Sequence, residues 1–180
     1  RQPRPAVRRR RALAGAERPL VVPGGALWSQ QDADRLTRFA ENWGLPVAVP
    51  FRRQDYMDNR HPNYAGDLGV GMNTRLGEAL KAADCILSLG SRLGDTLTSG
   101  YELMHPRAQG RRIIHVYPDP DEIGHLWRAD PGIAACPRSV LAALAEMPAP
   151  RRWDDWAAGV RAHYETWQTP RPTPGAVRME

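Results

Sequence analysis

The sequence has only two cysteines, Cys85 and Cys136, and neither belongs to a Cys-x-x-Cys or Cys/His metal pattern. Two widely separated cysteines argue against a disulfide framework and predict two buried free thiols in a reducing compartment. The chain also lacks an apolar run of membrane-spanning length and a signal-peptide pattern. We therefore expect a cytoplasmic protein that has no membrane partner.

Motifs that carry catalysis or metal binding are missing as well. Ser91 and Ser99 have no Gly-x-Ser-x-Gly context, and none of the five histidines lies at metal-ligand spacing from another. The chain contains no Gly-x-Gly-x-x-Gly dinucleotide fingerprint. We expect this chain to hold no catalytic residue and no metal ligand of its own.

Acidic residues are scarce only at the amino end. The formal net charge is +5, but residues 1–18 contain seven arginines and a single acid, so the rest of the chain is close to neutral. Such a run is typical of a solvated segment, and we assign residues 1–17 to a basic N-terminal linker with no nucleic-acid partner. The chain begins with Arg1 and ends in a proline-rich tail, so we expect a piece of a longer protein.

Short apolar runs alternate with helical patterns over residues 18–148. One helix is expected from the N-cap candidate Ser29 to the terminal glycine Gly44, and two more over residues 76–83 and 139–147. The alternation predicts an α/β fold, namely a Rossmann-like, doubly wound parallel sheet of five or six strands in three layers. The expected strands are residues 20–23, 46–49, 85–89, 113–117 and 132–136.

Three segments carry further expectations. Cys85–Leu89 is the most continuously apolar run, which favours a central place in the sheet. Residues 50–67 are rich in Arg, Asp, Asn and Pro and predict a long irregular loop. Residues 153–167 carry aromatic side chains at near-helical spacing and predict a linker helix held on the domain by aromatic burial, or else a ligand-stacking surface. We assign residues 149–180 to this helix and a proline-rich connector to a missing domain.

The turn after residues 85–89 is the most informative feature of the chain. Gly90 ends the expected strand, and Arg92 follows at the carboxyl end, where ligands bind in open α/β sheets. Exposed backbone N–H groups and a guanidinium suit an anion such as a phosphate. The alternative for Arg92 is a salt bridge to Asp95 or another acid. Gly24 and Gly25 follow the first strand, either as a phosphate contact or as a tight turn that packing requires.

Taken in order, these segments resemble the central domain of thiamine-diphosphate enzymes of the acetolactate synthase type. The resemblance covers roughly residues 18–148. The matching stretches are residues 18–25, 39–49, 61–66, 83–92 and 113–124.

This resemblance implies a parent enzyme of three α/β domains, a transferase or lyase that decarboxylates 2-oxo acids or makes and breaks carbon–carbon bonds next to a carbonyl. Thiamine diphosphate and magnesium are bound in this family by the first and third domains, and no Gly-Asp-Gly motif of the third domain occurs here. The resemblance also implies a homo-oligomer, a dimer or a tetramer, and predicts that this piece alone is inactive. The central domain of the family holds FAD, ADP or nothing.

The resemblance assigns cofactor-binding roles to Gly24, Gly25, Gly90, Arg92 and Asp95, which match family positions near the nucleotide phosphates. The chain departs from the family after Asp95, where a second acid and an arginine are missing. It also has Tyr117 and Cys136 where acids are usual at the adenosine end. The pattern thus keeps the phosphate end of an FAD or ADP site and loses the adenosine end, and we expect flavin binding to be weak or absent.

Two alternatives of a different class stay open from the sequence. One is a stand-alone nucleotide-binding module, which the missing Gly-x-Gly-x-x-Gly disfavours. The other is a structural or oligomerisation domain without a ligand. The arrangement of residues around Gly24, Arg92 and Tyr117 discriminates between a nucleotide site and a purely structural domain.

Overall fold

Six strands in the described part of the chain form one parallel sheet in the order β3-β2-β1-β4-β5-β6. The computed structural model describes residues 12–107 and 110–170. Most of the basic N-terminal linker and the end of the proline-rich connector lie outside these residues. The strands are β1 (Pro19–Pro23), β2 (Val47–Pro50), β3 (Tyr64–Leu68), β4 (Cys85–Leu89), β5 (Arg112–Tyr117) and β6 (Gly132–Ala134).

All strand pairs are parallel, and the order reverses between β1 and β4, so the sheet is doubly wound as predicted. β4 lies between β1 and β5, which confirms the expected central position of its apolar run. Leu87 and Ile86 of β4 are completely buried, one on each face of the sheet.

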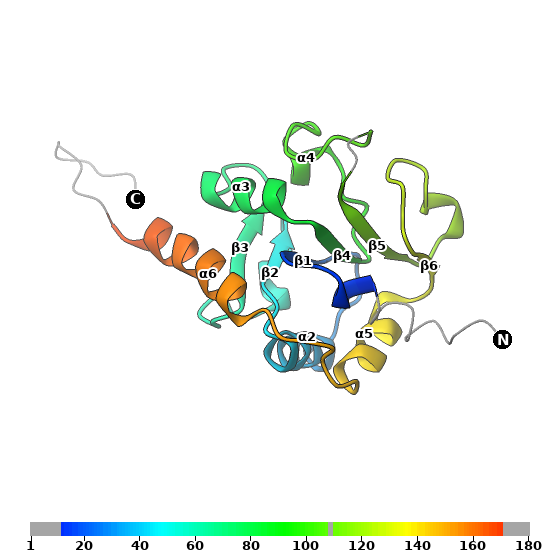
Figure 1. Ribbon diagram of the computed structural model, residues 1–180, viewed down its shortest axis with the longest axis horizontal. Helices are drawn as coiled ribbons and strands as arrows, with labels where there is room; N and C mark the ends of the chain where they lie inside the picture. Colours follow the sequence, from blue (N-terminus) through cyan, green and yellow to red (C-terminus); the bar gives the residue numbers. More distant parts are fainter. Residues whose placement is uncertain (1–11, 108–109, 171–180) are drawn as a thin grey trace.

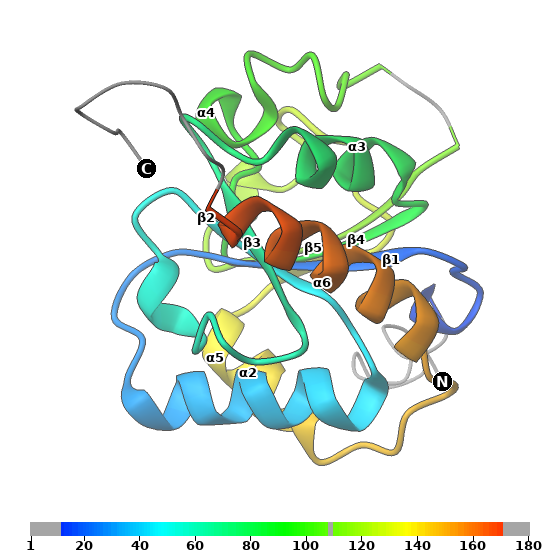
Figure 2. The same cartoon turned by 90° about the vertical axis from the view of Figure 1, so that its left-hand side faces the viewer.

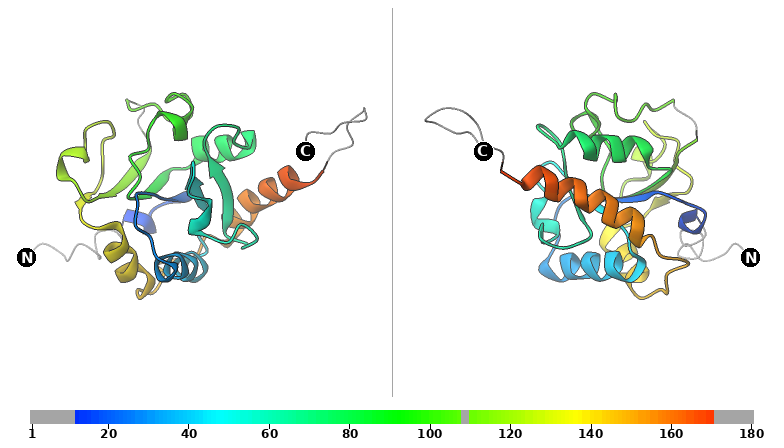
Figure 3. Two further views of the ribbon diagram at one scale, coloured as in Figure 1. Left: turned by 180° about the vertical axis from the view of Figure 1, so that it is seen from behind. Right: turned by 60° about the vertical axis from the view of Figure 1, so that its left-hand side comes forward.

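Helices cover both faces of the sheet (Figure 1). α2 (Gln30–Trp43) and α5 (Pro137–Ala145) lie side by side on one face, and α3 (Thr74–Ala82) and the short α4 (Asp95–Thr98) lie on the other. Figure 3 shows the same two layers from behind. Two 3₁₀ turns, η1 (Gln54–Tyr56) and η2 (Pro120–Glu122), lie in the connections. This arrangement is the three-layer fold that the sequence predicts.

The helix α2 forms where its local signals place it. The Ser29 side chain accepts from the backbone N–H of Asp32, and the Asp32 carboxylate accepts from the N–H of Ser29, so both ends of a capping box are present. Gly44 ends the helix in the left-handed conformation. The last core helix, α5, begins at Pro137, two residues before the expected Ser139, because proline is well suited to the first turn of a helix.

The edge strand β3 was not expected, because residues 50–67 read as an irregular loop. Gly66 and Asp67 have low strand propensity, but tertiary packing overrides it. Tyr64 packs edge-to-face on Tyr164 at 5.1 Å between ring centroids. A side chain at Gly66 would lie 3.1 Å from Leu76 and 3.3 Å from Tyr164, so glycine lets β3 approach both helices that cover it.

The aromatic helix α6 (Asp154–Gln168) runs across the outer side of β3, beside α3 (Figure 2). Trp153 and Trp156, at its start, donate their indole N–H groups to the carbonyls of Ala16 and Pro19 at 2.9 and 2.8 Å. Aromatic burial therefore holds this part of the helix on the domain, as expected, whereas Trp167 at the far end is 52% exposed. No helix in residues 12–107 and 110–170 is long and apolar enough to cross a membrane.

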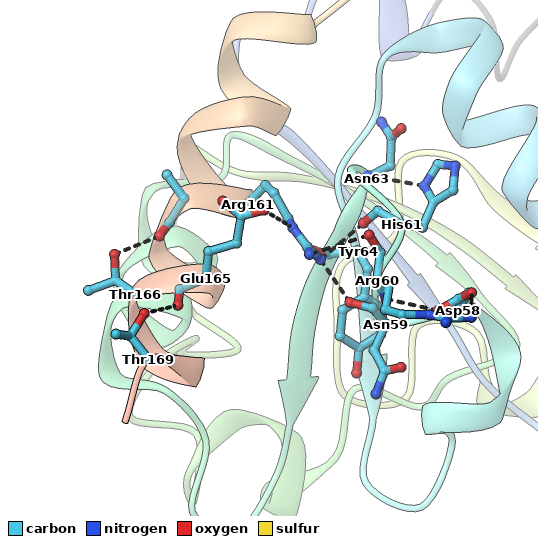
Figure 4. A network of polar contacts seen from close by, with 11 residues as sticks. Asp58, Asn59, Arg60, His61, Asn63, Tyr64, Arg161, Glu165, Thr166 and Thr169 are labelled. Atoms are coloured by element: carbon cyan, nitrogen blue, oxygen red, sulfur yellow. Dashed lines mark hydrogen bonds and ion pairs between the residues drawn. The ribbon is translucent and has the colours of Figure 1, made fainter. Parts of the chain in front are cut away.

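Arg161 fixes the middle of α6 to the segment before β3 (Figure 4). Its Nη1 group donates to the carbonyls of Asn59 and His61 at 2.8 and 3.0 Å and contacts that of Tyr64 at 3.3 Å. Its Nε group donates to Glu165, one turn further along the helix, at 2.9 Å. One partly buried guanidinium thus donates to several carbonyls of an irregular segment.

Candidate functional site

The carboxyl ends of β1 and β4 bring the predicted glycines together at one edge of the sheet. Pro23 is paired with Leu89, so the turns that follow both strands start at the same height. The Gly24 N–H donates to the carbonyl of Leu89 at 2.9 Å. The Gly24–Gly25 turn and the Gly90 turn are therefore in direct contact at the topological switch point.

Both turns need glycine for steric reasons. A Cβ atom on Gly90 would lie 2.7 Å from the Gly24 carbonyl oxygen and 2.7 Å from Pro137, and the φ angle of Gly90 is +89°. A Cβ atom on Gly24 would lie 2.8 Å from the Cα atom of Ser91. Packing alone thus requires glycine at these two positions, which is the tight-turn alternative that the sequence left open; an anion role for them stays a prediction.

The backbone donors at this edge differ from the expected set. The N–H groups of Gly24 and Gly90 do not point to solvent, because they donate to Leu89 and to Val116 at 2.9 and 2.8 Å. The N–H group of Gly90 is therefore not among the donors that this turn can offer to an anion. The N–H groups of Gly25, Ser91 and Arg92 have no acceptor within the part of the chain that the structure describes. They are the donors that an anion at this edge can use.

Two buried polar side chains, Ser88 and His115, hold the turn at Ser91 in place. The Ser91 carbonyl accepts from the Ser88 hydroxyl at 2.7 Å and from His115 Nε2 at 2.9 Å. The other ring nitrogen, Nδ1, has no hydrogen-bond partner among the described residues. Burial lowers the pKa of His115, which keeps the ring neutral. The contact of His115 with this turn follows from the pairing of Ser88 with His115 in the sheet.

Arg92 is oriented by two acceptors. Its Nε group donates to the Tyr117 hydroxyl at 3.0 Å and lies 3.3 Å from a carboxylate oxygen of Glu122. These contacts raise the pKa of Arg92, and the hydrogen bond to Tyr117 has the largest effect. The salt-bridge alternative therefore exists, but with Glu122 and not with Asp95. Asp95 begins α4, and its carboxylate accepts from the N–H of Thr96 at 2.8 Å.

Sequence reasoning missed the residues that cover the Gly24–Gly25 turn. Arg53 Nε and the Tyr56 hydroxyl both donate to the Gly25 carbonyl at 2.8 Å. Trp28 stacks on Tyr56 at 4.5 Å and donates to the Gly24 carbonyl. Part of the loop after β2 therefore packs on the site and is not a solvated surface segment. The signal in the sequence that could have indicated this is the presence of the aromatic residues Trp28 and Tyr56 in two loops.

A hollow of about 340 Å³ lies next to these turns, between the first turns of α2 and α5. Arg138 lines it and donates to the carbonyl of Leu27, in the loop after β1. Cys136 also lines it and is exposed, which corrects the expectation of two buried thiols. It is exposed because it lies at the amino end of α5, after the short edge strand β6.

The two thiols should therefore react differently. Burial raises the pKa of Cys85 to about 12, whereas hydrogen bonding from the Ser139 N–H lowers the pKa of Cys136. Since the thiolate is the reactive form, a chromogenic disulfide reagent at neutral pH should modify one thiol in the folded protein and two in denaturant. Cys136→Ser should abolish the reaction of the folded protein. Fast modification of Cys136→Ser would show that β4 opens readily.

The described residues contain no group of three or more His, Cys, Asp or Glu side chains that could hold a metal ion. They do fit a phosphate group, since three N–H donors and the guanidinium of Arg92 lie at one edge of the sheet. What the arrangement can do chemically is bind and orient an anion.

Comparison with known proteins gives a consistent result. Residues 9–144 match the family described as thiamine pyrophosphate enzyme, central domain. The chain is 31% identical to glyoxylate carboligase of Escherichia coli O157:H7 over 136 residues, which cover 75% of this chain and 22% of that protein. It is 29% identical to acetolactate synthase of Mycobacterium avium over 139 residues, 77% of this chain and 22% of that protein. The chain spans about a quarter or less of the length of these relatives.

Proposed function

The chain belongs to the central-domain family of thiamine pyrophosphate enzymes, and from this membership we propose that it acts as the middle domain of a thiamine-diphosphate-dependent transferase or lyase. The parent enzyme decarboxylates a 2-oxo acid or makes or breaks a carbon–carbon bond next to a carbonyl. Support comes from relatives named glyoxylate carboligase, acetolactate synthase and sulfoacetaldehyde acetyltransferase.

In this proposal, residues outside this chain bind thiamine diphosphate and magnesium. The cofactor, when bound there, supplies the ylid and the electron sink for the reaction. Residues 18–148 form the domain proper, and residues 1–17 and 149–180 connect it to an N-terminal and a C-terminal domain. The isolated chain is then inactive, and the parent is a cytoplasmic homo-oligomer. The absence of a Gly-Asp-Gly motif from the sequence supports this division of labour.

The domain's own part in the proposal is to bind a phosphate-bearing nucleotide at the carboxyl ends of β1 and β4. The observation that carries it is the orientation of Arg92. Its hydrogen bond to Tyr117 and its ion pair with Glu122 are both made at Nε, so the two Nη groups at the end of the planar fork are left for an anion. Tyr117, which replaces a family acid, then orients the arginine and no longer accepts from the nucleoside.

Arg92→Ala should weaken ADP binding by about tenfold or more, because a charge-assisted contact to phosphate is lost. Isothermal titration calorimetry of the chain with ADP measures the affinity. The affinity of Arg92→Lys should lie between those of the wild type and Arg92→Ala, because lysine keeps the positive charge but lacks the planar guanidinium. Arg75→Ala, which breaks an exposed ion pair with Glu78 on α3, serves as the control and should bind like the wild type. Equal binding by Arg92→Ala and the wild type would mean that Arg92 does not contact the nucleotide.

A further inference from the structure

A hollow lies at the opposite end of the strands from Arg92. It has a volume of about 600 Å³ and surrounds the amino ends of β4 and β5, where Cys85 is paired with Arg112. This volume is in the range of small-molecule sites. Its charged side chains are Asp84, Arg107, Arg111, Arg112, Arg128 and Asp130.

Two of the arginines are held in place by carbonyl groups. Arg111 Nε donates to the Ala83 carbonyl at 2.9 Å, and its Nη2 group donates to that of Lys81. Arg112 Nη1 donates to the Ala12 carbonyl at 2.8 Å. Burial lowers the pKa of Arg111, and no acid offsets that effect. Both guanidinium groups are thus fixed before any ligand arrives, and neither has a carboxylate partner among residues 12–107 and 110–170.

The acids of the cavity do not balance its arginines. The two carboxylate oxygens of Asp84 accept from the backbone N–H groups of Glu17 and Arg18 at 2.7 and 2.8 Å, so Asp84 serves to fix the chain before β1. Asp130 is the only other carboxylate of the described lining. Four guanidinium groups and two carboxylates leave a formal charge of +2, with His105 neutral.

The remaining two arginines, Arg107 and Arg128, are exposed, and their guanidinium groups have no hydrogen-bond or ion-pair partner in the part of the chain that the structure describes. They come from two different loops, before β5 and before β6. The cavity is also lined by the apolar side chains of Met104, Ile113 and Trp127. The cavity therefore combines fixed and free guanidinium groups with a partly apolar surface.

We propose that this basic cavity binds a small polyphosphate anion, such as free pyrophosphate or a nucleoside diphosphate. The excess of two positive charges matches a multiply charged anion, and the planar fork of arginine matches phosphate oxygens. The site is independent of the proposed nucleotide contact at Arg92, because the two lie at opposite ends of the strands.

The experiment is a titration of the ¹⁵N-labelled chain in the Arg92→Ala background, so that the Arg92 edge is weakened. Pyrophosphate, ADP and adenosine are the probes, followed by amide chemical shifts. Pyrophosphate should shift the amides of residues 84–85, 111–113 and 128–130. The double variant Arg107→Glu/Arg128→Glu should weaken this binding by about tenfold or more. Adenosine should cause no shifts there.

The control Arg38→Glu/Arg75→Glu makes the same change in net charge on α2 and α3 and should bind pyrophosphate like its parent. Equal weakening by both double variants would overturn the proposal, because it would mean unspecific attraction to net charge. Shifts confined to residues 24–25 and 90–92 would overturn it as well. Equal affinity for pyrophosphate and ADP would show that the site recognises only the phosphate groups. A higher affinity for ADP would show that the nucleoside also contributes to binding. Both results support the proposal. Arg107→Ala/Arg128→Ala replaces the charge-reversed variant if that variant fails to fold.

Discussion

Gly90→Ala should lower the free energy of unfolding by about 3 kcal/mol or more. Part of this loss, about 1–2 kcal/mol, comes from forcing a residue with a Cβ atom into a φ angle of +89°. The rest comes from overpacking, because the new Cβ atom would lie 2.7 Å from the backbone oxygen of Gly24 and from Pro137. Neither contact can relax by rotating a flexible side chain. The turn between β4 and α4 would have to separate from the turn after β1.

Gly94→Ala provides the matched control four residues away. Gly94 has a φ angle of −74°, and a Cβ atom added there would meet nothing within 4 Å. Its substitution should change the stability by about 0.5–1 kcal/mol at most, in the stabilising direction if the unfolded chain loses freedom. Urea unfolding of both variants measures the difference. If Gly90→Ala were as mild as Gly94→Ala, the two turns would not be in the contact described here.

The sequence predicts most of the sheet because most strands are buried on both faces. β1 and β4 are buried along their whole length, β5 is buried in its middle, and α2 has a cap at each end, so local signals suffice for these elements. β3 could not be predicted, because a Tyr-Ala-Gly-Asp-Leu segment becomes a strand only when β2 and α6 pack against it. Because the end of β4 can be predicted from the sequence, the positions of Gly90 and Arg92 just after this strand can be predicted as well.

The surroundings of the candidate site depend on register and on loops, which the sequence does not reveal. Ser88 and His115 meet only because β4 and β5 pair as they do, and this pairing supports the Ser91 turn. Glu122 reaches Arg92 from a separate 3₁₀ turn. The basic cavity likewise requires segments far apart in the chain to meet at the amino ends of two strands. Local patterns therefore locate the site, and tertiary packing decides which groups are free in it.

Arg161→Ala should lower the free energy of unfolding by about 2–4 kcal/mol and release α6 from β3. The Arg161 side chain is only 14% exposed, and it donates to the carbonyls of Asn59, His61 and Tyr64. Removing the guanidinium takes a donor from each of these carbonyls in a partly buried segment, although the His61 carbonyl keeps the N–H of Tyr64 at 2.9 Å. Arg161→Lys should lose most of the same stability, because a compact ammonium cannot reach several carbonyls as the planar fork does.

The ion pair between Arg161 and Glu165 contributes little of this effect. Glu165 is 62% exposed, so Glu165→Ala should change the stability by about 0.5 kcal/mol or less. Hydrogen exchange distinguishes the two causes, since Arg161→Ala should speed exchange of the amides of α6 and β3 well before global unfolding, while Glu165→Ala should not. Equal effects of the two substitutions would mean that the ion pair, and not the carbonyl contacts, holds the helix. Because α6 leads into the connector of the proposed parent enzyme, its firm attachment would make the central domain a rigid base for the domain that follows.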